Sequence, residues 1–207
     1  MRLVIDLRII LLILFFISTS QIKVYCIFLF SILGHELAHI VCAKILKMQI
    51  EEVSFGVFGF SAQIYQFGKN KSLHRIFMYL AGPVFNLILS FLFYIFQAPK
   101  EFVDINLLLG LLNLMPILPL DGGRVLKEIL KYFYDYKFAN SFMLEFTKVN
   151  LVIISLVYSI AILKLKNVMI LILIIYLWWL YSIEEKKMQT LKRVYGIIEK
   201  SIEKIWD

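Results

Sequence analysis

Residues Val24 to Leu46 read VYCIFLFSILGHELAHIVCAKIL, an apolar run long enough to cross a membrane that is interrupted by His35, Glu36 and His39. An ionisable residue at bilayer depth costs about 2.5–3.5 kcal/mol on insertion scales, so three together require a metal ion or polar partners. Residues four apart in a helix lie on the same face, about one turn from each other. The two imidazoles can therefore hold one metal ion, and Glu36 is placed to accept a proton from an attacking water.

The whole chain has the composition of a multi-pass membrane protein. Of its 207 residues, 61% are hydrophobic and 18% are charged, and the mean hydropathy is +0.82. A soluble domain carries about half apolar and about a quarter charged residues. The apolar segments are Ile9–Ile22, Val24–Leu46, Ile76–Phe96, Ile105–Leu120, Val149–Leu163 and Val168–Ile183. We therefore expect an all-α multi-pass membrane protein of about six transmembrane helices, although several segments are shorter than the roughly 20 residues that an upright span needs.

Two segments depart from this pattern of apolar helices. Between the second and third helices, Val53 and Phe55 alternate with small or polar residues, which predicts a short membrane-associated strand or hairpin. Residues 184–207 are polar with apolar positions three to five apart, which predicts a cytoplasmic amphipathic helix. The expected organisation is a transmembrane domain over residues 1–183, with its core motifs in residues 35–124, followed by this tail.

Lysine and arginine fall mainly on one side of the expected topology. With the N-terminus in the cytoplasm, the cytoplasmic segments carry Lys47, Lys69, Lys71, Arg75, Arg124, Lys127, Lys131, Lys137, Lys148, Lys186, Lys187, Lys192 and Arg193. The opposite side holds Lys23, Lys100, Lys164 and Lys166. Because cytoplasmic loops are enriched in basic residues, both termini are expected in the cytoplasm. The net charge of +7 is then explained by membrane topology and not by nucleic-acid binding.

A third metal ligand is required, because catalytic zinc usually has three protein ligands and one open position. The candidate is Asp121, within the stretch NLMPILPLDGGR that runs from Asn113 to Arg124. Pro116 and Pro119 should break the fourth helix, and a broken helix in a membrane usually lines a cavity. Taken alone, Asp121 also fits the N-cap of a helix from about Gly123 to Tyr134. The histidines of the second helix favour the ligand role.

Two asparagines accompany these candidate ligands. Asn113 is placed to orient the substrate carbonyl or stabilise a developing oxyanion. Its alternative is an ordinary interhelical hydrogen bond, which asparagines in membranes often make. In the third helix, the stretch AGPVFN ends at Asn86, which would lend polar support to the site. Gly82 and Pro83 in that stretch are interpreted as packing features.

Three motifs in a fixed order make the chain similar to a known family. They are HELAH at 35–39, AGP at 81–83, and Asn113-x-x-Pro116 leading to LDGG at 120–123. This set resembles the site-2 protease family of intramembrane metalloproteases, peptidase family M50. Among its subfamilies the chain most resembles the stage IV sporulation protein FB branch, which lacks a PDZ domain between its core helices.

The resemblance implies a Zn²⁺ ion bound by His35, His39 and Asp121, with Glu36 as the catalytic acid/base. It also implies a cell-membrane location, an active site near the cytoplasmic side, and regulated intramembrane proteolysis of membrane-associated proteins. The sporulation branch further implies a sigma-factor precursor as substrate and inhibitory membrane proteins as partners.

Other classes of membrane protein fit these residues less well. A catalytically inactive metal-binding scaffold or a divalent-metal transporter needs no general base beside the ligands, so Glu36 argues against both. A membrane metallopeptidase whose third ligand is a glutamate is disfavoured by Asp121, since Glu101 and Asp104 are expected on the opposite side.

Overall fold

The computed structural model describes most of the chain from residue 22 onward. The described residues are 22–48, 50–56, 59–64, 71–165, 171, 174–190 and 193. The first expected helix, apart from its final residue, lies outside them, as does most of the C-terminal tail.

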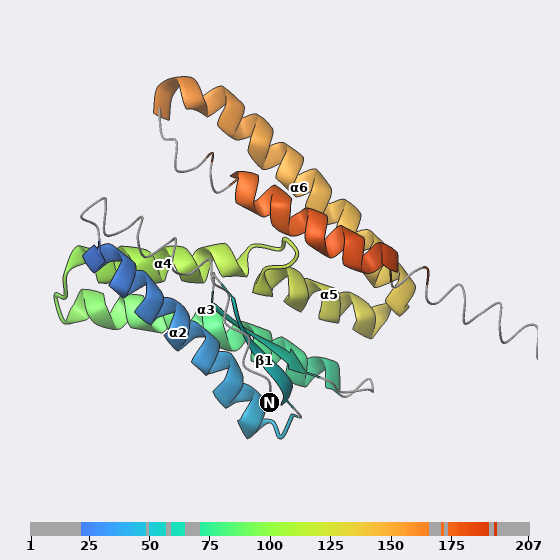
Figure 1. Ribbon diagram of the computed structural model, residues 1–207, viewed down its shortest axis with the longest axis horizontal. Coiled ribbons are helices and arrows are strands. Elements are labelled where there is room, and N and C mark those ends of the chain that lie inside the picture. The colour runs from blue at the N-terminus through green and yellow to red at the C-terminus, as the bar shows by residue number, and fades with distance from the viewer. Residues whose placement is uncertain are drawn as a thin grey trace, which may run out of the picture.

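The described part of the chain is almost entirely helical, as the sequence predicts (Figure 1). The helices are α2 (Ile22–Ile45), α3 (Lys71–Ile95), α4 (Lys100–Leu114), α5 (Asp121–Phe133) and α6 (Tyr136–Leu165), and residues 174–190 form a further helix. Among the described residues, three stretches are long and apolar enough to cross a membrane. These are Ile22–Ile45, Ser72–Ile95 and Tyr136–Ser159. They support a membrane protein, and the expected total of about six spans stays a prediction.

Two helix boundaries differ from the limits of the apolar segments. The apolar segment Ile105–Leu120 is not helical throughout: the fourth helix ends at Leu114, at the break that the prolines predict, because the residue before a proline disfavours helical angles. Met115 accordingly has extended backbone, with φ −60° and ψ 136°. The next long helix, α6, begins at Tyr136, well before the apolar run at residue 149. The charged residues in its first half do not interrupt a helix, so hydropathy alone misplaces its start.

The metal-site helices form one group and the C-terminal helices another. Helix α3 packs against α2, α4 and α5, and α5 in turn contacts α6. Figure 1 shows α6 and the helix over 174–190 lying side by side, with α5 between that pair and the rest. The two C-terminal helices are joined by a hydrogen bond from Trp178 Nε1 to Ser155 Oγ of 3.0 Å. Ile117, in the link before α5, is buried in their apolar core with Leu151 and Tyr181. The C-terminal helices therefore support the segment that leads to Asp121.

A β-hairpin follows α2. Strands β1 (Ile50–Gly56) and β2 (Gly59–Ile64) pair antiparallel, with Gly56 opposite Gly59 and a register irregularity between Ile50 and Glu52. Strand β2 lies near α2. The hairpin occupies the segment in which the sequence predicts short strands, and its association with the membrane stays a prediction.

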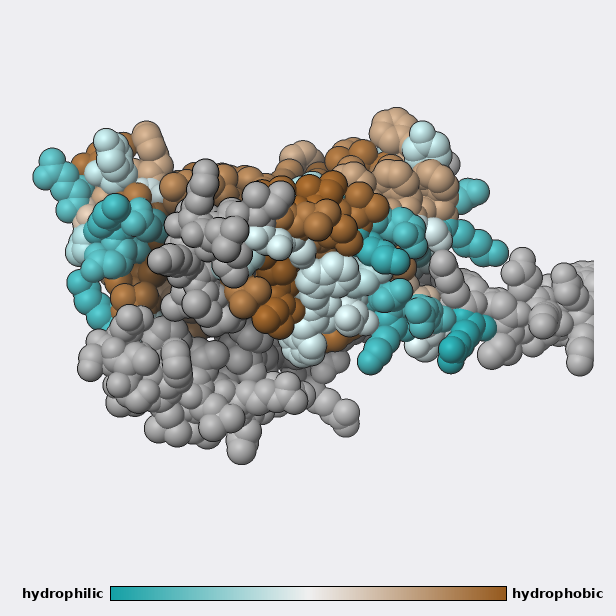
Figure 2. Space-filling view, turned by 90° about the horizontal axis from the view of Figure 1, so that it is seen from above, coloured by the Kyte–Doolittle hydropathy of each residue, from teal (hydrophilic) through white to brown (hydrophobic). Residues whose placement is uncertain are grey.

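Large apolar side chains cover the outside of the helices. Phe77, Phe91 and Leu37 are 59%, 63% and 58% exposed, respectively. Figure 2 shows a brown apolar band across one face, with hydrophilic residues gathered towards its two ends. Apolar surface on this scale is unfavourable in water and suits a lipid environment. Buried polar groups, by contrast, lie between the helices, and three of them form the site described next.

Candidate metal centre

Two histidines of α2 present nitrogen atoms to the same point. His35 and His39 are 5% and 7% exposed, and their Nε2 atoms lie 3.1 Å apart. The spacing of four residues places both imidazoles on one helical face. Their ring planes are nearly perpendicular, at 85°, which prevents stacking and lets both edges face a common centre.

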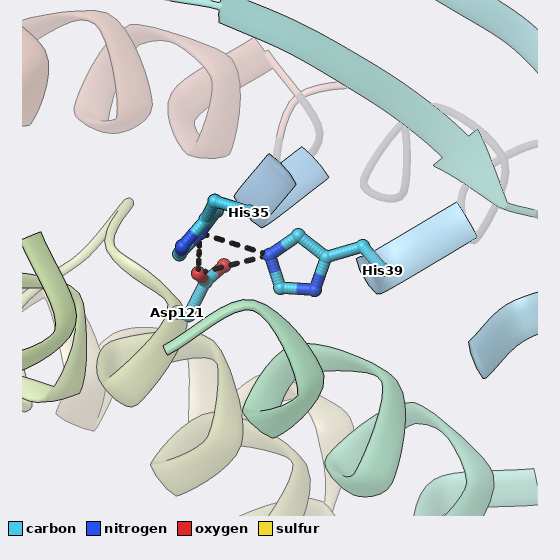
Figure 3. Close-up of side chains that lie close together, drawn as sticks. All are labelled: His35, His39 and Asp121. Atoms are coloured by element: carbon cyan, nitrogen blue, oxygen red, sulfur yellow. Dashed lines mark hydrogen bonds and ion pairs between the residues drawn. The ribbon is translucent and has the colours of Figure 1, made fainter. Parts of the chain in front are cut away.

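Asp121 completes the cluster from a distant part of the chain (Figure 3). Its Oδ2 atom lies 3.0 Å from His35 Nε2 and 3.1 Å from His39 Nε2. Around a tetrahedral zinc with bonds of about 2.0–2.2 Å, ligand atoms lie about 3.3–3.5 Å apart. The three donor atoms are therefore within a few tenths of an ångström of the separations that zinc requires.

The orientation of His39 fits the role of a metal ligand. His39 Nδ1 lies 2.6 Å from the backbone carbonyl of Met78, which can only accept, so Nδ1 carries the proton. A neutral imidazole then has a lone pair on Nε2, and that lone pair faces the carboxylate of Asp121 and the Nε2 of His35. The three atoms lie 3.0–3.1 Å apart. One metal ion held between them would contact all three at once, whereas a proton on His35 Nε2 would bridge only the pair of atoms that it joins.

The break between α4 and α5 brings Asp121 to this position. The chain turns through Met115 to Leu120, and α5 begins at Asp121 itself. The N-cap residue is Leu120, with no side-chain cap, so the carboxylate of Asp121 is not used as a cap. Gly122 allows the turn, because a Cβ there would collide with the backbone carbonyl of Leu114. The helix thus starts two residues before Gly123, the start that the sequence predicts.

Helix α3 closes the other side of the cluster through Gly82. A Cβ at this position would lie 2.7 Å from His35 Nε2 and closer still to His39 Nε2. Only a glycine allows α3 to approach the two ligand nitrogens so closely. Pro83 follows inside the helix, where it removes one backbone hydrogen bond. The sequence identifies Gly82 as a packing residue, but its contact with the ligand atoms could not be foreseen without the tertiary structure.

Comparison with known proteins agrees with this geometry. The model of the family described as Peptidase family M50 matches residues 23–103 and 100–157. The chain belongs to peptidase family M50.

Curated relatives include proteins named as zinc metalloproteases and a sporulation protein. A zinc metalloprotease of Methanocaldococcus jannaschii is 32% identical over 120 residues, which cover 51% of this chain and 34% of that protein. Stage IV sporulation protein FB of Bacillus subtilis is 30% identical over 116 residues, which cover 52% of this chain and 40% of that protein. The chain therefore spans less than half the length of these relatives.

A solved structure shows the same fold. The site-2 protease from Methanocaldococcus jannaschii superposes with a TM-score of 0.65 and 24% sequence identity, over 88% of this chain and 89% of that one. The agreement covers most of this M50 protein and shows that the two chains share a fold.

The two expected catalytic residues, Glu36 and Asn113, differ in their relation to the candidate ligands. Glu36 is half-buried next to His35 on α2 and lies within electrostatic range of Asp121 and Arg124. Asn113 donates its amide N–H to the backbone carbonyl of Leu109, one turn earlier in α4, at 3.1 Å. No hydrogen bond within the described part of the chain joins Asn113 to the three candidate ligands. Its proposed contact with a substrate carbonyl stays a prediction.

A buried ion-pair network fastens α5 to α3. Glu128, 4% exposed, accepts from Arg75 Nε at 2.8 Å and from Lys131 Nζ at 2.7 Å. Burial alone would raise the pKa of the Glu128 carboxyl, but Lys131 and Arg75 outweigh it and hold this pKa below its usual range. Burial, with repulsion from Lys131, lowers the pKa of Lys127 to about 8. The network keeps α5 in place and thereby positions Asp121.

Proposed function

We propose that this M50 chain is an intramembrane zinc metalloprotease, in which His35, His39 and Asp121 hold the metal. The observation that carries the proposal is the convergence of three possible ligand atoms at 3.0–3.1 Å, with the His39 tautomer set by Met78. Two imidazoles and one carboxylate are a common ligand set for catalytic zinc. The names of the relatives support the choice of zinc over other divalent ions.

Peptide hydrolysis follows from the residues around this centre. His35, His39 and Asp121 would hold the zinc, which when bound would act as a Lewis acid toward the attacking water and the scissile carbonyl. Glu36, adjacent to His35 on α2, accepts the proton of the water and later returns it to the leaving amine. A scaffold or a transporter has no use for a base in this position. The apolar outer surface indicates that the substrates are membrane-associated proteins.

The active site is proposed to lie near the cytoplasmic side, with both termini in the cytoplasm. Arg75, near the start of α3, and Lys127 and Lys131, on α5, are basic residues on two helices that flank the metal cluster, and basic residues mark the cytoplasmic side. Modification by a membrane-impermeant thiol reagent in intact cells tests this orientation. A cysteine introduced at the exposed Lys137 should be protected, and one at the exposed Lys100 should react. The reverse pattern contradicts the orientation.

The hairpin is proposed to hold the substrate in extended form. A helical substrate hides its backbone in internal hydrogen bonds and has to unwind before cleavage. The two strands form a sheet of order β1-β2, so within the described residues each has an outer edge free to pair with a peptide. A proline substituted on an outer edge should reduce cleavage, and unchanged cleavage would remove this part of the proposal.

The protease function is tested by co-expression with a panel of membrane-associated substrates that includes a sporulation sigma-factor precursor. Wild type and Glu36→Gln are compared at matched expression and matched zinc content. Cleavage by the wild type that disappears in the variant supports the proposal. Equal cleavage by both proteins contradicts the assigned mechanism. The sigma-factor precursor is one member of the panel, suggested by the likeness to stage IV sporulation protein FB.

A further inference from the structure

Arg124 lies beside the metal cluster and is not used by the function proposed so far. It sits on α5 three residues after Asp121, so both side chains project from the same side of the helix. Its Nε donates to the backbone carbonyl of Pro119 at 2.9 Å. Its guanidinium carbon lies 5.6 Å from the centroid of the Tyr79 ring. Tyr79 adjoins Met78, the residue whose carbonyl holds His39, so the guanidinium lies close to the ligand cluster.

The partners of Arg124 differ from those of the other cations near α5. Arg75 and Lys131 are both paired with the carboxylate of Glu128. Within the part of the chain that the structure describes, no carboxylate lies at ion-pair distance from Arg124. Asp121, Glu184 and Glu36 are near enough to act on it electrostatically but do not bind it. A neutral carbonyl and an aromatic ring hold this half-buried cation, and no described residue accepts a hydrogen bond from its two terminal amino groups.

We propose that Arg124 is a substrate-binding catalytic residue that donates its terminal N–H groups to the carbonyl oxygen of the scissile peptide. This inference rests on the proposed protease function. When the water oxygen bonds to the carbonyl carbon, the C=O electron pair moves onto the carbonyl oxygen and the water proton passes to Glu36. The negative charge then sits on an oxygen that a guanidinium can bind through two N–H groups.

The surroundings of Arg124 suit it better than Asn113 to bind the carbonyl oxygen of the scissile peptide. The amide of Asn113 already donates to its own helix. The guanidinium is held in advance by Pro119 and Tyr79, so little ordering is needed during the reaction. Arg124 is also half-buried against Tyr79 of α3, where screening by water is weaker and a charge interaction is stronger than in solution.

The test uses the purified full chain loaded with zinc, with Arg124→Gln and Arg124→Lys as variants. Lys127→Gln is the matched control, since Lys127 is also a half-buried cation on α5 but is not placed at the cluster. Two quantities are measured: cleavage of the substrate that the panel identifies, and the Kd of a short phosphinic peptide, whose tetrahedral anion mimics the charged oxygen. Zinc content and thermal stability are recorded for each protein.

We expect Arg124→Gln to lower kcat by about 100-fold or more, the usual loss when one oxyanion donor is removed. Phosphinate binding should weaken to a similar degree, with zinc content unchanged. Arg124→Lys should lie between Arg124→Gln and wild type, and Lys127→Gln should match wild type. If Arg124→Gln binds the phosphinate as tightly as the wild type, the inference is overturned, whatever the stability of the variant. Arg124 would then only stabilise the packing of α5 against α3. Should Arg124→Gln not fold, Arg124→Lys with wild-type kcat and affinity overturns it as well. Cleavage by Glu36→Gln equal to wild type would instead mean that the proposed function itself fails.

Discussion

Gly82→Ala should disrupt the metal site while leaving the helix that carries it intact. The added Cβ would lie 2.7 Å from His35 Nε2 and 2.6 Å from His39 Cε1. Ordinary van der Waals contact begins at 3.4 Å, so His35 would have to retreat by about 0.7 Å and His39 by at least about 0.8 Å, or α3 would have to move away. Zinc bond lengths tolerate deviations of only about 0.2 Å. We therefore expect zinc affinity to fall by about 10–100-fold, the range found when a residue that orients zinc ligands is replaced.

Gly82→Ala should stabilise helix α3 itself, although it weakens zinc binding. Alanine is favoured over glycine in a helix interior by about 1 kcal/mol. Loss of zinc without loss of helical folding would therefore locate the damage at the ligands. Gly110→Ala is the matched control, because its Cβ would also be crowded, at 2.8 Å from Leu87 Cδ2 and 3.2 Å from the Pro83 carbonyl, but would touch no ligand.

Zinc affinity is measured by competition with a chelator in detergent micelles, with circular dichroism to follow helical content. Gly82→Ala should release zinc at a chelator concentration at least tenfold lower than wild type and Gly110→Ala. If Gly82→Ala holds zinc and cleaves substrate as the wild type does, α3 does not approach the ligands as described. If both alanine variants lose zinc equally, the effect is one of general packing.

Three further predictions concern the charges that hold α5. Glu128→Ala should destabilise the protein by about 3–5 kcal/mol, because it leaves Arg75 and Lys131 without their buried partner, and an unchanged melting temperature would contradict this. Since the folded-state pKa of Glu128 lies below that of the unfolded chain, its stabilising contribution is complete above pH about 4.3 and is lost as the pH falls through the folded value. The melting temperature of Glu128→Gln should therefore fall less steeply in acid than that of wild type. The pKa of Lys127 is about 8 in the folded protein and about 10.4 in the unfolded chain. Between these two pH values the unfolded chain binds more protons, so the stability of the folded protein should rise with pH. Lys127→Met should abolish that rise.

The candidate ligands could be predicted from the sequence because their spacing and surroundings are informative locally. His35 and His39 are four apart on an apolar helix, and Asp121 follows two prolines that must interrupt a membrane segment. Helical content follows from composition in the same way. The structure adds that all three donor atoms meet at 3.0–3.1 Å.

Other features depend on contacts between distant segments and could not be predicted in this way. The role of Gly82 arises from the approach of α3 to α2, which no local pattern encodes. Arg124 counts in the sequence only as one of many cytoplasmic cations, and its position follows from the turn at Pro119. The start of α6 could not be predicted from hydropathy. Hydropathy marks only the apolar run, whereas a helix can extend beyond that run into charged residues.

The most direct test of the central claim is the zinc environment of the purified protein. X-ray absorption at the zinc edge, with metal content by mass spectrometry, should show equimolar zinc bound by two imidazoles and by oxygen at about 2.0–2.2 Å. Asp121→Ala should lose most of the zinc, and His35→Ala should lose one imidazole signal together with affinity. A zinc spectrum that is the same in both variants as in the wild type would contradict the assignment of His35, His39 and Asp121 as its ligands.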